Sequence, residues 1–362
     1  MSKRIAGLVL LACAGAANAQ IAGTGAGIVT SSNVTLFGVV DVAAAWGGGS
    51  IADRTRLVSG ANSSSRVGFR GVEDLGAHLG AGFWLEAGVN ADDGTGATSN
   101  TNNQPVSGSG SGGLTFNRRS TVSLMGDWGE LRLGRDIVAS WRNKDQTDPF
   151  STNGVGTTLP HAITIAGVTA QRASNMIGYF LPQALLPGVF GEAQYYAGEN
   201  QSGSDGNGWQ ARLGYANKTW GLAAGYGLTK YAQTATLGDT QVWNVGAHWD
   251  FGVARLTAGY FHDTVKQVAE RTGTGYIVGA VAPIGAGQLK LSYSTYKVDD
   301  LGDPTARKLA LGYVYNLSQR TALYATYAHI DNRGPSDAAL NGALTAPGSS
   351  SNGVDLGLKH SF

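Results

Sequence analysis

The chain has 362 residues, of which 55 are glycine, and only 14% of its residues are charged. This charged fraction lies well below the roughly 25% of ordinary soluble domains. The formal net charge is only +1, so it does not indicate binding to a highly charged partner such as nucleic acid. The sequence contains no run of about 18 apolar residues, so it predicts no transmembrane helix.

The first 19 residues have the layout of a secretory signal peptide. Two basic residues precede a short apolar run, and an A-x-A cleavage site follows it: Lys3 and Arg4, residues 5–14, and Ala17-Asn18-Ala19. We expect cleavage after Ala19, which also removes Cys13, the only cysteine of the chain. A mature chain without cysteine suits an oxidising compartment. The alternative, a lipoprotein acceptor at Leu10-Leu11-Ala12-Cys13, would cut the apolar run short.

A tail rich in Gly, Ala, Ser and Thr extends to Ser32, and beyond it one pattern repeats to the last residue. Stretches of about ten residues alternate apolar with polar or small side chains, and turn signals separate them. Sixteen such stretches are predicted to be strands, near Val34, Arg66, His78, Asn117, Glu130, Ser174, Val189, Trp209, Leu222, Val242, Val253, Tyr276, Leu289, Lys308, Ala322 and Gly353. An even number of strands of this length favours a closed antiparallel barrel that crosses a bilayer. Sixteen strands leave a lumen too wide for side chains to fill, which predicts water inside.

The connections between the strands alternate in length. Short turns are predicted at residues 73–76, 126–129, 217–220 and 316–320, and long polar loops at residues 91–114, 136–171 and 331–351. Short turns on one side and long loops on the other are typical of an outer-membrane barrel. Each strand has one apolar face, as where Leu289, Leu291 and Tyr293 alternate with Lys290, Ser292 and Ser294. A soluble β-sandwich also alternates, but the strand number and the charged, glycine-rich second face favour the barrel.

The end of the chain continues the pattern. One face of the final strand carries Val354, Leu356, Leu358, His360 and Phe362. An ordinary edge strand is the alternative, although few soluble domains end in the middle of a strand. Trp128, Trp220 and Trp249 lie at or beside short turns, where an interfacial aromatic girdle is expected. Simple packing of the turns explains these tryptophans equally well.

Several motifs, in this order, resemble the Gram-negative general porins of the β-proteobacterial type. The most specific is residues 65–76, SRVGFRGVEDLG; the others are residues 34–41, 116–119, 131–135, 195–199, 317–324 and the closing His360-Ser361-Phe362. The resemblance implies a homotrimer of sixteen-stranded barrels in outer-membrane lipid and lipopolysaccharide, each with its third long loop folded inward. Two departures stand out: the extra residues 21–32 before the first strand, and Gly178, where a basic residue is expected.

The candidate pore residues are arginines and carboxylates. Alternation turns Arg66, Arg70 and Arg132 inward, since a lipid-facing arginine at mid-membrane costs about 2–4 kcal/mol. Counting back from Val122 and Leu124, which face outward, is interpreted as not turning Arg119 inward, so its place in the pore rests on the family's pattern alone. Arg135 lies at the root of the third loop, where alternation no longer constrains the direction of its side chain. Opposite them we expect the acids Asp41, Glu86 and Asp148, which would create a transverse field across the constriction. The alternative is that these arginines are tied up in ion pairs that brace the wall.

The sequence therefore predicts a water-filled outer-membrane channel for passive diffusion of small hydrophilic solutes and ions, with a weak preference for anions. A solute-specific channel is the nearest alternative; a barrel-embedded hydrolase and a soluble lectin-like β-protein are more distant ones. No cofactor or metal site is predicted, because the six histidines lie at no metal-ligand spacing and the sequence contains no G-x-S-x-G motif. The glycine-rich runs at residues 23–27 and 108–113 are interpreted as flexible loops rather than phosphate-binding loops, since neither lies between a strand and a helix.

Overall fold

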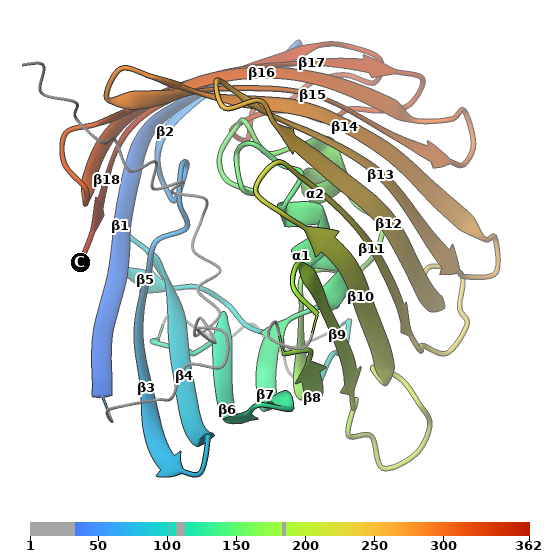
Figure 1. Cartoon of the computed structure of the whole chain (residues 1–362). Coiled ribbons are helices and arrows are strands. Elements are labelled where there is room, and N and C mark those ends of the chain that lie inside the picture. The colour runs from blue at the N-terminus through green and yellow to red at the C-terminus, as the bar shows by residue number, and fades with distance from the viewer. Residues whose placement is uncertain (1–32, 101, 106–112, 183–185) are drawn as a thin grey trace, which may run out of the picture.

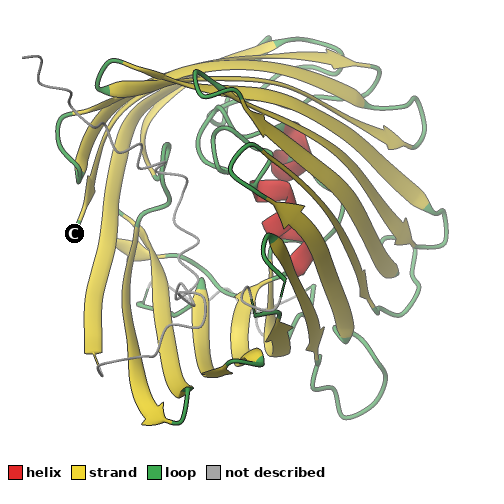
Figure 2. Cartoon of the chain, viewed as in Figure 1, coloured by secondary structure: helices red, strands yellow, loops and turns green. Residues whose placement is uncertain are grey.

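The computed structural model describes residues 33–100, 102–105, 113–182 and 186–362. The expected signal peptide at residues 1–19 and the tail up to Ser32 lie outside the described residues. The two described helices are short and lie inside a barrel of strands (Figures 1 and 2). Neither helix in the described part of the chain is long and apolar enough to cross a membrane.

Sixteen long antiparallel strands form the barrel, and their positions confirm the sixteen strands predicted from the sequence. They are β1 (Asn33–Gly48), β3 (Arg66–Gly76), β4 (Leu79–Asn90), β6 (Arg119–Gly126), β7 (Gly129–Ile137), β8 (Arg172–Phe180), β9 (Val189–Tyr196), β10 (Gly208–Ala216), β11 (Trp220–Thr229), β12 (Asp239–Asp250), β13 (Arg255–Lys266), β14 (Arg271–Ile284), β15 (Gly287–Asp299), β16 (Thr305–Asn316), β17 (Thr321–Arg333) and β18 (Ser351–Ser361). The first and last strands pair from Val39↔Ser361 to Gly48↔Asn352, which closes the barrel. Closure satisfies the backbone hydrogen bonds that an open edge would expose to lipid.

The alternation of side chains along the strands separates an apolar outer face from a polar inner face. On β16, Leu309 and Leu311 are exposed on the outside, whereas Lys308 and Ala310 are buried inside the barrel. Cross-strand partners keep the same face, so Leu309 lies beside Tyr293 on β15. This period of two, repeated on every strand, is what the sequence showed as alternation.

Two short strands were not predicted. β3 pairs with the first half of β1 and β2 (Arg54–Ser59) pairs with the second half. β2 and β3 therefore occupy one strand position of the barrel, and residues 60–65 interrupt it. The carboxylate of Asp41 holds this interruption by accepting hydrogen bonds from the backbone N–H of Asn62 (3.1 Å) and Ser63 (2.6 Å). The second short strand, β5 (Thr95–Gly96), pairs antiparallel with Val89 and Asn90 at the end of β4, so the long loop begins with a small hairpin.

The third long loop, residues 138–171, folds into the barrel, as the resemblance implied (Figure 1). It carries α1 (Ala139–Asp145), which packs on β9 to β12, and α2 (Leu159–Ala162), which packs on β14 to β16. Inward-facing glycines leave room for this loop. A Cβ on Gly246 would lie 2.6 Å from Thr147 Cγ2, and one on Gly279 would lie 2.3 Å from Pro149 Cγ, so the loop lies almost directly on the backbone of the wall.

Candidate pore constriction

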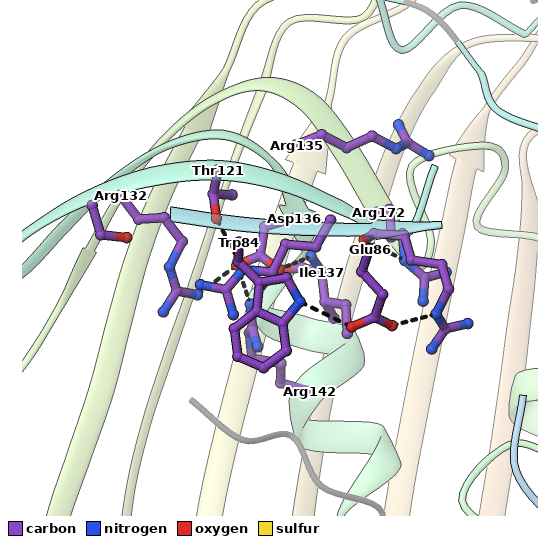
Figure 3. Close-up of polar contacts among 12 residues, drawn as sticks. Trp84, Glu86, Thr121, Arg132, Arg135, Asp136, Ile137, Arg142 and Arg172 are labelled. Atoms are coloured by element: carbon purple, nitrogen blue, oxygen red, sulfur yellow. Dashed lines mark hydrogen bonds and ion pairs between the residues drawn. The ribbon is translucent and has the colours of Figure 1, made fainter. Parts of the chain in front are cut away.

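A cavity of about 90 Å³ separates the inner wall of the barrel from the inward-folded loop. Its lining includes five arginines and three carboxylates, among serine, threonine and asparagine side chains: Arg66, Arg118, Arg119, Arg142 and Arg172, with Glu86, Asp136 and Asp145. The wall supplies Arg66, Glu86 and Arg119, while α1 supplies Arg142. Figure 3 shows Glu86 and Arg142 among the polar contacts of this region. The cavity is therefore the place where the loop narrows the lumen.

Glu86 on β4 organises the part of the wall nearest to β3. Its carboxylate accepts a hydrogen bond from Arg118 Nε at 2.5 Å and one from Trp84 Nε1 at 3.0 Å, and Arg66 Nε lies 3.7 Å from it. The indole of Trp84 lies between two further guanidinium groups, with Arg70 Cζ at 5.0 Å and Arg119 Cζ at 4.6 Å from the ring centroid. Cation–π contacts at this distance fix the direction of both arginines.

Asp136, the next-to-last residue of β7, is the centre of a second cluster. Arg132 Nη1 lies 2.5 Å and Arg142 Nη2 2.6 Å from its Oδ2, and Arg119 Nε lies 4.0 Å from its Oδ1. The ion-pair network continues along the wall, since Glu130 binds Arg132 (2.8 Å) and Glu192 lies between Arg142 (3.1 Å) and Arg212 (3.2 Å). Positive and negative groups thus alternate along this side of the lumen.

Four of the five predicted arginines lie on the inner face. Arg66, Arg70 and Arg132 do so as alternation indicated. Arg119 shares its face with Thr121 and Ser123, so the count from Val122 and Leu124 does place it inward, and our interpretation of that count was wrong.

Arg135 points away from the cavity. It pairs with Ser120 on β6, whose next partner Leu85 belongs to the outer face, and Figure 3 shows its side chain directed away from the cluster around Asp136. Its guanidinium instead binds Asn117 O (2.6 Å) and Asn100 Oδ1 (2.8 Å). The prediction that Arg135 lines the pore is therefore wrong.

The three predicted carboxylates do not face the arginines across the lumen. Glu86 lies among them on the same wall, Asp41 holds residues 60–65, and Tyr324 Oη donates a hydrogen bond to it. Asp148 is buried within the loop, where it accepts hydrogen bonds from the backbone N–H of Phe150 (2.9 Å) and Thr158 (3.2 Å), and burial raises the pKa of its carboxyl group above 3.8. Neither Asp41 nor Asp148 belongs to the lining of the cavity. The acid on the opposite side is Asp145 of α1, which the sequence analysis did not select.

Sequence reasoning also missed Arg118, Arg142, Arg172 and Asp136 as site residues. Arg118 stands in the motif at residues 116–119, and Arg142 stands in the loop expected to bend inward, so both carried a usable signal. Asp136 carried none, because its importance comes from three arginines that lie close to it only in the folded barrel.

Buried polar contacts fix the loop against the opposite wall. Lys144 Nζ lies 3.4 Å from Asp263 Oδ1 on β13, and Asn143 Nδ2 donates to Asn244 Oδ1 at 2.7 Å. His161 of α2 is completely buried beside Asp148, and burial, with the charge of Lys144, lowers the pKa of its imidazole well below 6.5. In the described ranges, no three His, Cys, Asp or Glu side chains come together as a metal ion would require.

A closed transmembrane barrel that is narrowed from within by a folded loop defines a channel-forming protein of the bacterial outer membrane. Comparison with known proteins agrees. The family model described as "Gram-negative porin" matches residues 6–335. Outer membrane porin protein 32 of Delftia acidovorans is 35% identical over 382 aligned residues, which cover 100% of both chains. An outer membrane porin protein of Bordetella pertussis is 26% identical, covering 96% of this chain and 98% of that protein.

Among solved structures, the anion-selective porin from Comamonas acidovorans superposes with a TM-score of 0.81 at 34% identity, covering 92% of this chain and 100% of that one. A trimeric form of OmpT from Vibrio cholerae, at 14% identity and a TM-score of 0.66, shares the fold. The chain belongs to the Gram-negative porin family. It is an outer-membrane diffusion channel, and membership of this family implies a channel rather than an enzyme.

Proposed function

We propose that the channel passes small hydrophilic solutes and ions down their gradients and prefers anions. The observation that carries the proposal is the charge of the cavity lining, where five arginines outnumber three carboxylates. Guanidinium groups stay protonated at any physiological pH, so the excess of positive charge is permanent. Of the residues predicted from the sequence, we propose that Arg66, Arg119 and Glu86 line the constriction, with Arg70 and Arg132 beside them on the inner wall but outside the lining of the cavity.

Two physical effects support this reading. The excess positive charge raises the local concentration of anions in the narrow part of the lumen and lowers that of cations. The charged groups also lie close together in alternating pairs, so a solute entering the cavity must replace water contacts with polar ones, which an apolar solute of equal size does poorly. The relative described as an anion-selective porin, at 34% identity, adds independent support.

Recording in planar lipid bilayers tests this function directly. With a tenfold salt gradient across the membrane, the reversal potential should have the sign of an anion-selective pore, and a zero or cation-selective value would contradict the proposal. The current should also rise almost linearly with salt. A conductance that saturates with one particular solute would favour a solute-specific channel instead.

We further propose that the channel is a homotrimer, and that the outer faces of β1, β3, β4, β6 and β18 form the subunit contact. Ten exposed tyrosines and tryptophans lie on β8 to β17: Tyr179, Tyr195, Trp209, Tyr215, Trp220, Trp249, Tyr276, Tyr293, Tyr315 and Tyr327. On the five proposed contact strands, Trp46 is the single exposed residue of either type among the described residues. Tyr and Trp are preferred at a lipid–water interface, so the face that lacks them is the better candidate for protein contact.

A pair of charge substitutions tests this arrangement. Leu36→Lys on β1 and Val278→Lys on β14 both introduce a charge on the outer face, where both wild-type side chains are exposed. Unheated samples on a native gel should show dissociated subunits for Leu36→Lys and intact trimers for Val278→Lys. Equal behaviour of the two variants would contradict the proposed contact face. Outer-membrane lipid and lipopolysaccharide are the surroundings proposed for the remaining face.

A further inference from the structure

We propose that Arg142, on helix α1 of the inward-folded loop, is a specificity-determining residue of the channel, and that Asp136 on the wall positions it. The inference rests on the proposed anion preference and deepens it. It assigns part of the selectivity to a charge carried by the loop, whereas the sequence analysis placed all of the selecting arginines on the barrel wall or at the root of the loop.

Arg142 reaches from the loop to the wall. Its Nη2 lies 2.6 Å from Asp136 Oδ2 and its Nε 3.1 Å from Glu192 Oε2, while the side chain also borders the cavity. The guanidinium therefore stands between β7 and β9 on one side and the cavity on the other. An ion that passes through the cavity meets this charge at contact distance.

Asp136 is shared by more cations than it can neutralise. Arg119, Arg132 and Arg142 all point toward its carboxylate, at 4.0, 2.5 and 2.6 Å. Of these four residues, Arg119, Arg142 and Asp136 line the cavity, whereas Arg132 is turned to Glu130 as well. One carboxylate thus gathers positive charge at the cavity and leaves an excess there.

Gly178 on β8 stands where the resemblance led us to expect a basic residue, and it leaves space on the wall near Arg142 of the loop. A Cβ at Gly178 would lie 3.2 Å from Phe180 Cε2, so glycine leaves room for the phenyl ring. Arg132 Cζ lies 4.0 Å and Arg142 Cζ 5.6 Å from the centroid of that ring. The position therefore has no charge of its own and supports two arginines from neighbouring segments.

The direction in which Asp136→Asn shifts the anion preference distinguishes two possible roles of Asp136. If its carboxylate only subtracts positive charge from the site, Asp136→Asn should strengthen the anion preference. If it positions Arg142, the same substitution should weaken the preference although the net charge has become more positive. The two roles thus predict opposite shifts in one measurement.

The experiment measures reversal potentials of the intact channel in planar bilayers under a potassium chloride gradient, for wild type, Arg142→Gln, Arg142→Lys, Asp136→Asn and the control Arg333→Gln. Arg333 lies exposed at the end of β17, away from the cavity, so its loss removes the same charge elsewhere. One unit charge at about 4 to 6 Å in a water-like dielectric changes the local concentration of each ion about threefold to sixfold, in opposite directions for anions and cations. Arg142→Gln should therefore lower the anion-to-cation permeability ratio roughly tenfold to 35-fold. Arg142→Lys should stay within about twofold of wild type, Asp136→Asn should lower the ratio, and Arg333→Gln should leave it unchanged.

An unchanged ratio for Arg142→Gln would overturn the inference, as would a ratio for Arg142→Lys as low as that of Arg142→Gln. An unchanged or raised ratio for Asp136→Asn would overturn the positioning role. A wild-type channel without anion preference would overturn the proposed function. The role of Arg142 would still be tested separately, by the difference in permeability ratio between wild type and Arg142→Gln. Heat-dependent gel mobility of each variant shows whether its barrel has folded. If Arg142→Gln does not fold, the ratio measured for Arg142→Lys decides, and a value more than about twofold from wild type would overturn the inference.

Discussion

Replacing Gly279 with alanine should displace the inward-folded loop. Gly279 lies on the inner face of β14 directly against Pro149, and an added Cβ would stand 2.3 Å from Pro149 Cγ and 2.8 Å from its Cδ. Ordinary carbon–carbon contacts lie at about 3.5–4.0 Å, so the loop must move by at least about 1.2 Å. A proline ring has no rotamer that swings it away, so the movement has to come from the loop backbone.

The movement is opposed by the contacts that hold this part of the loop. Thr257 Oγ1 donates a hydrogen bond to Thr147 O at 2.8 Å, and Asp148 is held by backbone N–H groups. Forcing one extra carbon into such packing costs about 1–3 kcal/mol, which is roughly a fivefold to 150-fold change in the ratio of seated to unseated loop. The added Cβ would also stand 2.9 Å from Thr257 Oγ1 on β13, so it strains the hydrogen bond that anchors the loop as well as the contact with Pro149. Because β14 blocks the other direction, the loop shifts toward the lumen.

Single-channel recording at fixed salt is the assay. Gly279→Ala should conduct less than wild type, and Gly279→Val less again, with more frequent closures as the loop leaves its seat. The matched control is Ala280→Val, one residue along the same strand, which faces outward because it pairs with the exposed Leu256 and Leu291. It should conduct like wild type. If folded Gly279→Ala and Gly279→Val both kept the wild-type conductance, the loop would not rest on this glycine.

Three further predictions concern the same part of the molecule. Arg66→Ala combined with Arg70→Ala should shift the reversal potential toward cations while trimers assemble normally on native gels; an unchanged potential would count against the inner-wall placement. Asp263→Asn removes the carboxylate that faces Lys144 at 3.4 Å. Breaking a buried pair of this kind costs about 3–5 kcal/mol, so the open-channel current should become noisier, and a quiet trace would refute the anchoring role. His161 remains neutral when the loop is seated, because its pKa lies well below the 6.5 that it regains when exposed. The position of the loop against the wall is therefore stable above about pH 6.5 and becomes less stable as pH falls below that value. Channel closures should increase between pH 7 and 5. A His161→Gln variant with the same pH dependence would contradict this role of His161.

The acid next to His161 sets the lower limit of that pH range. Burial raises the pKa of Asp148 above 3.8, so as pH falls from that raised pKa to 3.8 the carboxyl group takes up a proton in the seated loop before it would when exposed. This uptake favours the seated loop as pH falls, which is the opposite sign to that of His161. The loss of seating should accordingly be clearest in the mildly acidic range, before Asp148 titrates.

The barrel was predictable because it repeats one local rule. A period of two fixes which side chains meet lipid, and a wrong register on any strand would turn its leucines into the water-filled lumen. The rule failed where the strands depart from regularity. The interruption at residues 60–65 produced an unforeseen β2. Arg135 was misplaced for another reason: alternation from the outward Leu133 does turn it away from the pore, but the prediction did not apply the rule at the root of the loop.

The candidate site was only partly predictable, since its contacts join segments that are distant in sequence. Asp136 and Glu192 gain their importance from Arg142, and Asp41 turns out to hold a loop rather than to face the pore. Alternation states which face a residue occupies and says nothing about its partner. The inward-folded loop has no period at all, so α1, α2 and their contacts with the wall follow from packing alone.

The closing seam between β1 and β18 constrains how this protein is made. Ser351 Oγ donates to Gly48 O across 303 residues of chain, and neither strand has another partner on that side. A sheet that lacks β18 has two unpaired edges, one on β1 and one on β17, and lipid offers no hydrogen-bond partners for the backbone groups of either edge. Insertion of the closed barrel into the bilayer therefore requires the last strand. Until that strand is present, the unpaired edges must be shielded, for example by a chaperone, from pairing with other chains.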